Sequence, residues 1–239
     1  MQTITSRTSN ERILRAGLLM LLVDVFTLLF LWDGHIGYAR DNAAELAALL
    51  GLEPARSLPI DSTLSAARGK AAVAAIRPGE PVDTVRQVHG EPAVVKDGDL
   101  YYVGPGGWLH ISVENGRVRN TEWKDAAHSE ADQRWQRWIG YALAILGLVA
   151  TIQFAVVIAT RATVSAEGVR FGARPIIPWD AITDLRAVPA KRGAIELEYG
   201  AGDRHETIRM DDYRYKDLPA ITAAIAQRKN IADPLRGVA

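Results

Sequence analysis

The sequence places one ionisable side chain, that of Asp24, near the middle of a long apolar segment. At the centre of a lipid bilayer a charged aspartate costs about 2.5 to 3.5 kcal/mol, so this carboxyl group is expected to face protein or to be protonated. Two roles fit such a group: a hydrogen bond that fastens one helix to another, or a step in a proton or ion relay. Relays use several ionisable groups and this segment has one, which favours the hydrogen bond.

Other residue types that support catalysis or metal binding are scattered along the chain. The five histidines share no metal-ligand spacing and fall in separate segments: His35, His89, His110, His128 and His205. There is no cysteine, and the glycine-rich stretch 104–107 joins two predicted strands, whereas a phosphate-binding loop leads from a strand into a helix. The sequence therefore predicts a non-enzymatic protein, with no catalytic, cofactor or metal residues to assign.

Two apolar runs, 16–32 and 138–160, bracket a long polar stretch. A helix needs roughly 20 apolar residues to cross a bilayer, and a core helix of a soluble protein keeps a polar stripe that neither run has. Both runs are therefore predicted to span a membrane. An alternative for the first run is a cleaved signal peptide, because basic residues precede it and a small-x-small site follows it: Arg7, Arg12, Arg15, then Gly37-Tyr38-Ala39.

Small residues recur every four positions along the second run, at Gly147, Thr151, Ala155 and Ala159. Such a face lets another helix approach closely, because small side chains keep the two backbones near each other. We expect the first run to pack there as a hairpin, with Asp24 bonding to Thr151 or Gln153 at about its own depth. The same face also allows two copies of the chain to pair as a homo-oligomer.

Charge is unevenly distributed, although the chain as a whole has a formal net charge of zero. The stretch 33–134 has 11 Lys and Arg against 15 Asp and Glu, whereas 161–239 has 13 against 11. The N-terminal tail has three Arg against one Glu. Basic residues favour the cytoplasmic side of a membrane, so both termini are predicted to be cytoplasmic. A composition rich in Ala and Arg is typical of bacterial proteins, so the two spans and the charge bias predict a multi-pass bacterial inner-membrane protein. Scattered basic residues argue against nucleic acid as a partner.

These observations divide the chain into six segments. They are a cytoplasmic tail 1–15, a first span 16–32, an extracytoplasmic domain 33–134, a second span 138–160, a cytoplasmic domain 163–230 and a tail 231–239. The lipid bilayer is the one partner that this division implies directly.

The extracytoplasmic domain is predicted to have an α+β fold, with helices followed by an antiparallel meander. Helical spacing predicts helices at 42–50, with Asp41 or Asn42 as the N-cap, and at 62–76 and 81–88. Strands are expected at 93–96, 100–103, 108–113 and 117–123, with a tight hairpin at Asn115-Gly116.

One stretch of this domain combines a glycine that opens a short helix, a Gly-x-Pro that closes it, and a sheet ending in an Asn-Gly-basic-Val hairpin. The residues are Ile76, Gly79, Val85, Gly90, Pro92, Tyr101 or Tyr102, Ile111, Val113 and Gly116-Arg117-Val118. The pattern resembles the SmpA/OmlA (BamE-like) domain family over roughly 62–124, with departures at Glu80, Pro81 and His89. The resemblance implies a small protein-binding module that contacts its partner through its sheet face or helix groove.

The cytoplasmic segment is predicted to form a small β-barrel closed by a C-terminal helix. Strands are expected at 163–166, 169–172, 174–178, 182–188, 194–199 and 205–210, and the helix at 216–229. Glu167-Gly168-Val169, followed by the run 177–182 with its Ile-Pro-Trp, is similar to bacterial PH-like domains found beside membrane spans. The resemblance implies that Trp179 and Ile182 are core anchors. Two interpretations fit a set of four basic residues: contact with anionic headgroups, each worth about 1 kcal/mol near a membrane surface, or a solvated rim. The residues are Arg170, Arg174, Lys191 and Arg192.

The functional hypothesis is a protein-binding scaffold or adaptor of the bacterial envelope, linked to envelope or outer-membrane assembly through envelope protein partners. Two alternatives are a transmembrane sensor or regulator and an accessory subunit of a transporter. Very short linkers between spans and domains would favour the sensor, whereas the tether 53–62 favours a loosely held binding module.

Overall fold

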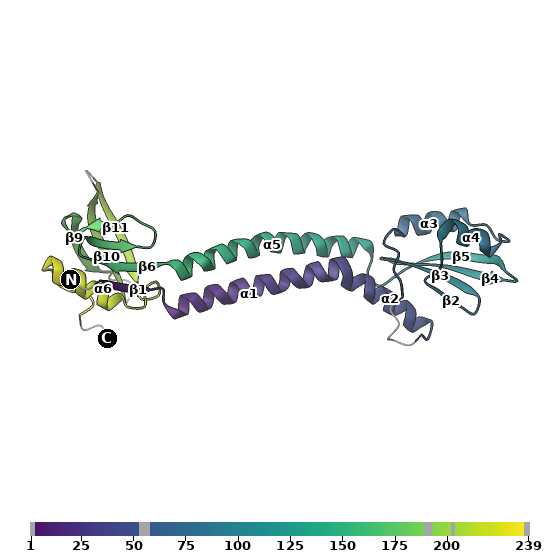
Figure 1. The fold of residues 1–239 in the computed structure, drawn as a ribbon, viewed down its shortest axis with the longest axis horizontal. Coiled ribbons are helices and arrows are strands. Elements are labelled where there is room, and N and C mark those ends of the chain that lie inside the picture. The colour runs from purple at the N-terminus through teal and green to yellow at the C-terminus, as the bar shows by residue number, and fades with distance from the viewer. Residues whose placement is uncertain (1–2, 53–57, 189–192, 202–203, 237–239) are drawn as a thin grey trace. The chain divides into compact units, whose positions relative to one another are not determined.

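The computed structural model describes residues 3–52, 58–188, 193–201 and 204–236. The chain divides into two compact units, and each is described by itself. Unit 1 comprises Met1–Val23 and Leu146–Ala239, and unit 2 comprises Asp24–Ile145. Each unit contains part of two long helices and one small domain of mixed α and β structure (Figure 1).

The two apolar runs form long helices. The first, α1 (Asn10–Trp32), continues through a π-helical turn (Asp33–Gly37) directly into α2 (Tyr38–Leu49). The second is α5 (Glu130–Ala159). By length and composition both helices qualify as candidate membrane spans. Over the 18 residues that make each one most apolar, 0% of the first helix and 17% of the second are buried. Most of their apolar surface therefore faces outward.

The continuation of α1 into α2 corrects one prediction. A separate helix beginning near Asn42, with Asp41 or Asn42 as its cap, was expected from helical spacing and capping residues; instead both residues lie inside α2. Gly34 and Gly37 are buried, and a Cβ on Gly34 would lie 2.7 Å from Cγ of Arg137. Gly34 therefore permits a close approach of α5, and neither glycine breaks the helix.

Within each unit the two helices pack through residues that are alternately three and four positions apart, the spacing of a coiled-coil seam. In unit 1 the less exposed residues of this stretch of α5 are Gly147, Ala150, Phe154 and Val157. A Cβ on Gly17 of α1 would lie 3.1 Å from the Phe154 ring. In unit 2 a Cβ on Gly140 would lie 2.7 Å from Leu31. Small residues therefore allow close contact in both units.

The unit 1 domain contains two antiparallel sheets and a helix. One sheet has the order β1-β6-β7-β8 and the other the order β11-β10-β9. The strands are β1 (Ile4–Arg7), β6 (Arg161–Val164), β7 (Gly168–Phe171), β8 (Ile177–Pro178), β9 (Ile182–Ala187), β10 (Ala194–Ala201) and β11 (Arg204–Asp211). The helix α6 (Leu218–Lys229) buries Leu218, Ile221 and Ile225 in a core shared with both sheets.

The expected strands and closing helix are present, but the pairings differ from a closed barrel. The described strands form two separate sheets of four and three strands. The strand predicted at 174–178 shortens to β8, and the predicted tail is partly packed, because Ile231 and Leu235 contact the core. Ile182 is buried, and Trp179 is partly buried against the same core.

The N-terminal segment is a strand of this domain, although it was predicted to be a tail. β1 pairs with β6, with Ile4 opposite Val164 and Arg7 opposite Arg161. Directly after β1 the Thr8 hydroxyl is buried and donates to the carbonyl oxygens of Val157, at 2.6 Å, and Thr160, at 3.1 Å. The strand before α1 is thus joined to the strand after α5.

The unit 2 domain is a four-stranded antiparallel meander in the order β2-β3-β4-β5, as predicted. The strands are β2 (Val94–Lys96), β3 (Asp99–Gly104), β4 (Gly107–Glu114) and β5 (Arg117–Asp125). Asn115 and Gly116 have φ values of 50° and 72°, which the tight hairpin between β4 and β5 requires.

Helices cover both faces of this sheet (Figure 1). Leu109 and Ile111 of β4 face a core formed with α3 (Ala66–Ala75) and α4 (Val82–His89). Trp108 of the same strand faces the opposite way, into a second core with α2. This alternation is the period of a strand buried on both sides.

Candidate functional site

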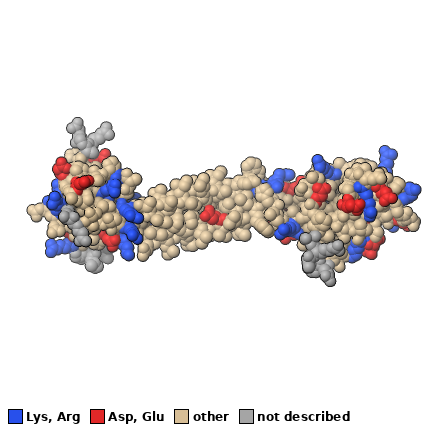
Figure 2. Space-filling view, viewed as in Figure 1, with Lys and Arg blue, Asp and Glu red and all other residues tan. Residues whose placement is uncertain are grey.

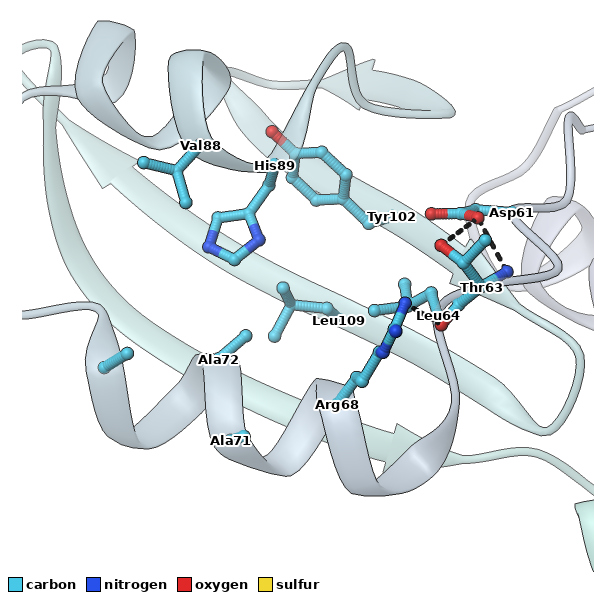
Figure 3. A pocket seen from close by; sticks show the side chains of 11 residues that line it. Asp61, Thr63, Leu64, Arg68, Ala71, Ala72, Val88, His89, Tyr102 and Leu109 are labelled. Atoms are coloured by element: carbon cyan, nitrogen blue, oxygen red, sulfur yellow. Dashed lines mark hydrogen bonds between the residues drawn. The ribbon is translucent and has the colours of Figure 1, made fainter.

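The α3–α4 groove is a cavity of about 440 Å³ in the unit 2 domain. Figure 3 shows α3 and α4 as its two walls and the sheet as its floor. Eleven residues line it: Asp61, Thr63, Leu64, Arg68, Ala71, Ala72, Ala75, Val88, His89, Tyr102 and Leu109. The alanines of α3 have small side chains, so they do not fill the space between the two helices.

Apolar side chains line part of the α3–α4 groove. Leu109 forms part of the floor and is fully buried, whereas Val88 of α4 is 71% exposed at the rim. The alanines of α3 add small apolar surface opposite Val88. Exposed apolar surface of this kind, beside a cavity, is typical of sites that bind an apolar side chain of a partner.

Polar side chains also line the groove, and three of them lie together at one end (Figure 3). Asp61 accepts hydrogen bonds from the backbone N–H and the hydroxyl of Thr63, both at 2.8 Å, and Arg68 donates to the Thr63 carbonyl oxygen at 3.1 Å. The Tyr102 hydroxyl donates to Gly90 at 3.1 Å, and burial raises the pKa of this phenol. The His89 ring stands edge-on to Tyr102, with centroids 6.2 Å apart. His89, a departure from the family pattern, thus lines the groove.

A second polar cluster lies on the other face of the sheet and was not predicted. His110 Nε2 is 2.8 Å from Asp99 and its Nδ1 is 2.9 Å from Glu122, while its ring stacks on Tyr101 with centroids 4.6 Å apart. Both ring nitrogens face carboxylates, so neither is placed to act as a base toward a substrate. Sequence alone could not reveal this cluster because it depends on strand register: His110 lies opposite Tyr101 and Glu122.

Both carboxylates of this cluster are stabilised in their charged form. Burial alone would raise the pKa of Asp99, but hydrogen bonds from the Val113 N–H, His110 and Ser112 outweigh it and lower the pKa. Hydrogen bonds from His110 and Lys124 lower the pKa of Glu122. The cluster therefore binds the sheet together through charge-assisted hydrogen bonds.

The residues predicted to join the helices fall in both units. Asp24 is half-buried in unit 2, and the small-residue face belongs to unit 1, so a bond between them stays a prediction. Gly147 is buried, whereas Thr151, Gln153, Ala155 and Ala159 are exposed. The reason is geometric: four residues exceed one helical turn, so a strict four-residue stripe drifts away from the packed side.

The residues predicted to touch a membrane surface are only partly described. Arg170 is exposed on β7, and Arg174 is exposed in the turn that follows it. Lys191 and Arg192 lie outside the described residues. Among the described residues no group of three or more His, Cys, Asp or Glu side chains is placed to hold a metal ion.

Comparisons with models of protein families, with curated proteins and with solved structures find no match for this chain. The two family resemblances therefore stay predictions. The function has to be argued from the candidate spans, the α3–α4 groove and the charges of the two units.

Proposed function

We propose that the chain is a two-span bacterial inner-membrane protein whose unit 2 domain binds a segment of an envelope protein in the α3–α4 groove. It acts without catalysis, as a scaffold or adaptor. The observation on which this rests is the groove itself, an open cavity of about 440 Å³ with both polar and apolar lining and an exposed valine at its rim. An apolar side chain of an extended or helical peptide fits such a groove.

Exposure of the long helices supports the membrane placement. A core helix in a soluble protein would be covered, yet leucines along α1 are exposed: Leu14, Leu18, Leu21, Leu22 and Leu28. Exposed tryptophans also cluster at one end of the candidate spans, namely Trp32, Trp135 and Trp138. The stretch of α1 from Arg15 to Trp32 is about 26 Å long at 1.5 Å per residue, close to the hydrocarbon thickness of a bilayer.

The pairing of β1 with β6 supports retention of the first helix. A signal peptidase that cut after Ala39 would remove β1 together with α1. The C-terminal domain would then lose an edge strand in which Ser6 is fully buried. A retained helix, with both termini in one domain, agrees with the predicted cytoplasmic location of both ends.

The test is copurification from bacterial cells in mild detergent, comparing the wild type with Val88→Glu. Val88 is exposed, so its replacement should leave folding intact but place a charge in the groove, weakening partner binding by at least about tenfold. Val95→Glu, at an exposed position of β2 outside the groove, is the matched control. A partner recovered with the wild type and the control but lost with Val88→Glu is expected. Recovery of the wild-type chain alone contradicts the proposal.

A second candidate, a transmembrane sensor or regulator, is favoured by the short junctions between helices and domains. Thr8 and Ser9 separate β1 from α1, and Thr160 alone separates α5 from β6. In unit 2, α1 runs into α2 without a break. Such short junctions would pass a movement of the helices on to the adjoining strands. If the protein is a sensor, a ligand in the groove should change hydrogen exchange in β6. If it is a scaffold, hydrogen exchange in β6 should not change.

A further inference from the structure

A cavity of about 240 Å³ lies in unit 1 where the first turns of α1 meet α5 and the segment after β11. Its lining combines two arginines with an apolar wall and two uncharged polar side chains. The residues are Arg12, Arg15, Ala16, Leu19, Ala150, Gln153, Val157 and Tyr213. Gln153, which was predicted to bond to Asp24, thus lines this cavity.

One of the two arginines that line the cavity, Arg15, contacts two neighbouring groups. The Arg15 guanidinium lies over the Tyr213 ring, 5.6 Å from its centroid, and also pairs with Glu11 one helical turn earlier. Both members of that pair are exposed, so water screens it and leaves Arg15 able to exchange partners. Arginine forks match phosphate oxygens in geometry as well as charge.

Further positive charge surrounds the arginines. Burial raises the pKa of Tyr215, while Arg214 and Arg12 lie close enough to its hydroxyl to oppose that rise. Figure 2 shows Lys and Arg side chains along the edge of the unit 1 domain next to its helices. Basic side chains are therefore present beside the helix ends, where a phosphate layer would lie if the helices span a bilayer.

Beyond the arginines the cavity becomes apolar. Leu19 is 53% exposed and continues into the uncharged surface of α1, and Ala16 and Ala150 leave room between the helices. A ligand that fits has an anionic group at one end and a hydrocarbon chain at the other. A polar glycerol region between them would meet the Gln153 amide.

We propose that this cavity binds the headgroup phosphate of an anionic phospholipid, with an acyl chain lying along Leu19. The proposal rests on the proposed membrane placement of the helices. It differs from a diffuse attraction between basic residues and the membrane surface, because two arginines and the shape of one cavity select the ligand. A neutral zwitterionic lipid would bring its own cation to the arginines and bind less tightly.

The test measures lipid retention by native mass spectrometry of the full chain in mild detergent. Phosphatidylglycerol and phosphatidylcholine with identical acyl chains are compared, and soluble glycerol 3-phosphate is added as a competitor. The wild type should retain phosphatidylglycerol selectively. Arg12→Gln combined with Arg15→Gln should weaken that retention by at least about tenfold, because two phosphate contacts are lost. Ala16→Leu, which fills the cavity but keeps every charge, should weaken it as well.

The matched control removes the same charge elsewhere in unit 1, by combining Arg209→Gln with Arg236→Gln, both at exposed positions. It should change retention by less than about twofold. Equal losses in the control and the Arg12, Arg15 variant would overturn the site, as would full retention by that variant. Displacement of the lipid by glycerol 3-phosphate at similar concentrations would overturn the assignment to a lipid.

Alkaline carbonate extraction of membranes separates this proposal from the proposed function. A wild-type chain released by carbonate contradicts the membrane placement. A chain that stays in the membrane but shows no preference for phosphatidylglycerol contradicts the lipid site alone.

Discussion

The two small domains use their sheets in different ways. In unit 1 both sheets and α6 enclose one continuous core, and strands β1 and β6 flank the two long helices directly. In unit 2 one sheet separates two smaller cores, and α3 and α4 cover one face without meeting over it. The unit 1 domain therefore joins the ends of the helices through β1 and β6, whereas the unit 2 domain has an open groove, in which we propose that a partner binds.

Deleting residues 1–7 tests the joining role of unit 1 and should have the largest effect. The deletion removes four paired residues of β1 and a buried serine, so we expect unit 1 to lose about 3 kcal/mol or more of stability. Hydrogen-exchange mass spectrometry should show faster exchange in β6 and α6 and unchanged exchange in β3 and β4. Thr5→Ala, at an exposed position of the same strand, is the control; unchanged protection of β6 in the deletion would refute the joining role.

Asn42→Ala tests whether unit 2 has its own anchor for the helix ends. Asn42 is 1% exposed; its amide donates to the carbonyl oxygens of Pro105 and His128, both at 2.7 Å, and accepts from the His128 N–H at 3.0 Å. Leaving these buried groups unpaired should cost about 2 to 4 kcal/mol. Denaturant unfolding in detergent measures the loss. Asn120→Ala, at an exposed position of β5, should cost less than about 0.5 kcal/mol, and an equal loss in both variants would contradict the anchor.

Asp99→Asn should have the smallest effect and a defined pH dependence. The lowered pKa of Asp99 means that its contribution to stability is present above the unfolded pKa, near pH 4, and is lost as pH falls through the folded pKa. We expect the variant to be about 1 kcal/mol less stable at pH 7 and equal to the wild type at strongly acidic pH. Glu114→Gln removes an exposed carboxylate of the adjacent strand β4 as a control. A stability difference independent of pH would contradict the role given to this carboxylate.

Sequence patterns predicted individual helices, strands and hairpins better than they predicted which distant strands pair. The meander of unit 2 followed from alternation and from Asn115-Gly116, because hairpins depend on neighbouring residues. The strand β1 was missed, because Ile4–Arg7 is short and its partner β6 lies on the far side of both helices in the sequence. The division of the unit 1 strands into two sheets could not be predicted for the same reason, since it depends on pairing between distant strands.

The candidate site was predicted in part. The resemblance to the SmpA/OmlA family implied a helix groove as a contact surface, and unit 2 contains such a groove, although the family assignment itself stays a prediction. The His110 cluster required knowledge of strand register. The residues of α5 that pack against α1 were predicted incorrectly in part because the assumed spacing was wrong. A spacing of four suggested Thr151 and Ala155, whereas the observed alternation of three and four gives Ala150 and Phe154.

The central claim is that the helices cross a membrane, with the unit 2 domain outside and the unit 1 domain inside, and the absence of cysteine from the chain allows a direct test. Single substitutions Glu114→Cys, in unit 2, and Glu167→Cys, in unit 1, both replace exposed side chains. Bacterial spheroplasts that express each variant are treated with a membrane-impermeant maleimide before and after permeabilisation. The account predicts labelling of Glu114→Cys in intact spheroplasts and of Glu167→Cys only after permeabilisation. Labelling of both variants in intact spheroplasts, or the reverse pattern, would contradict it.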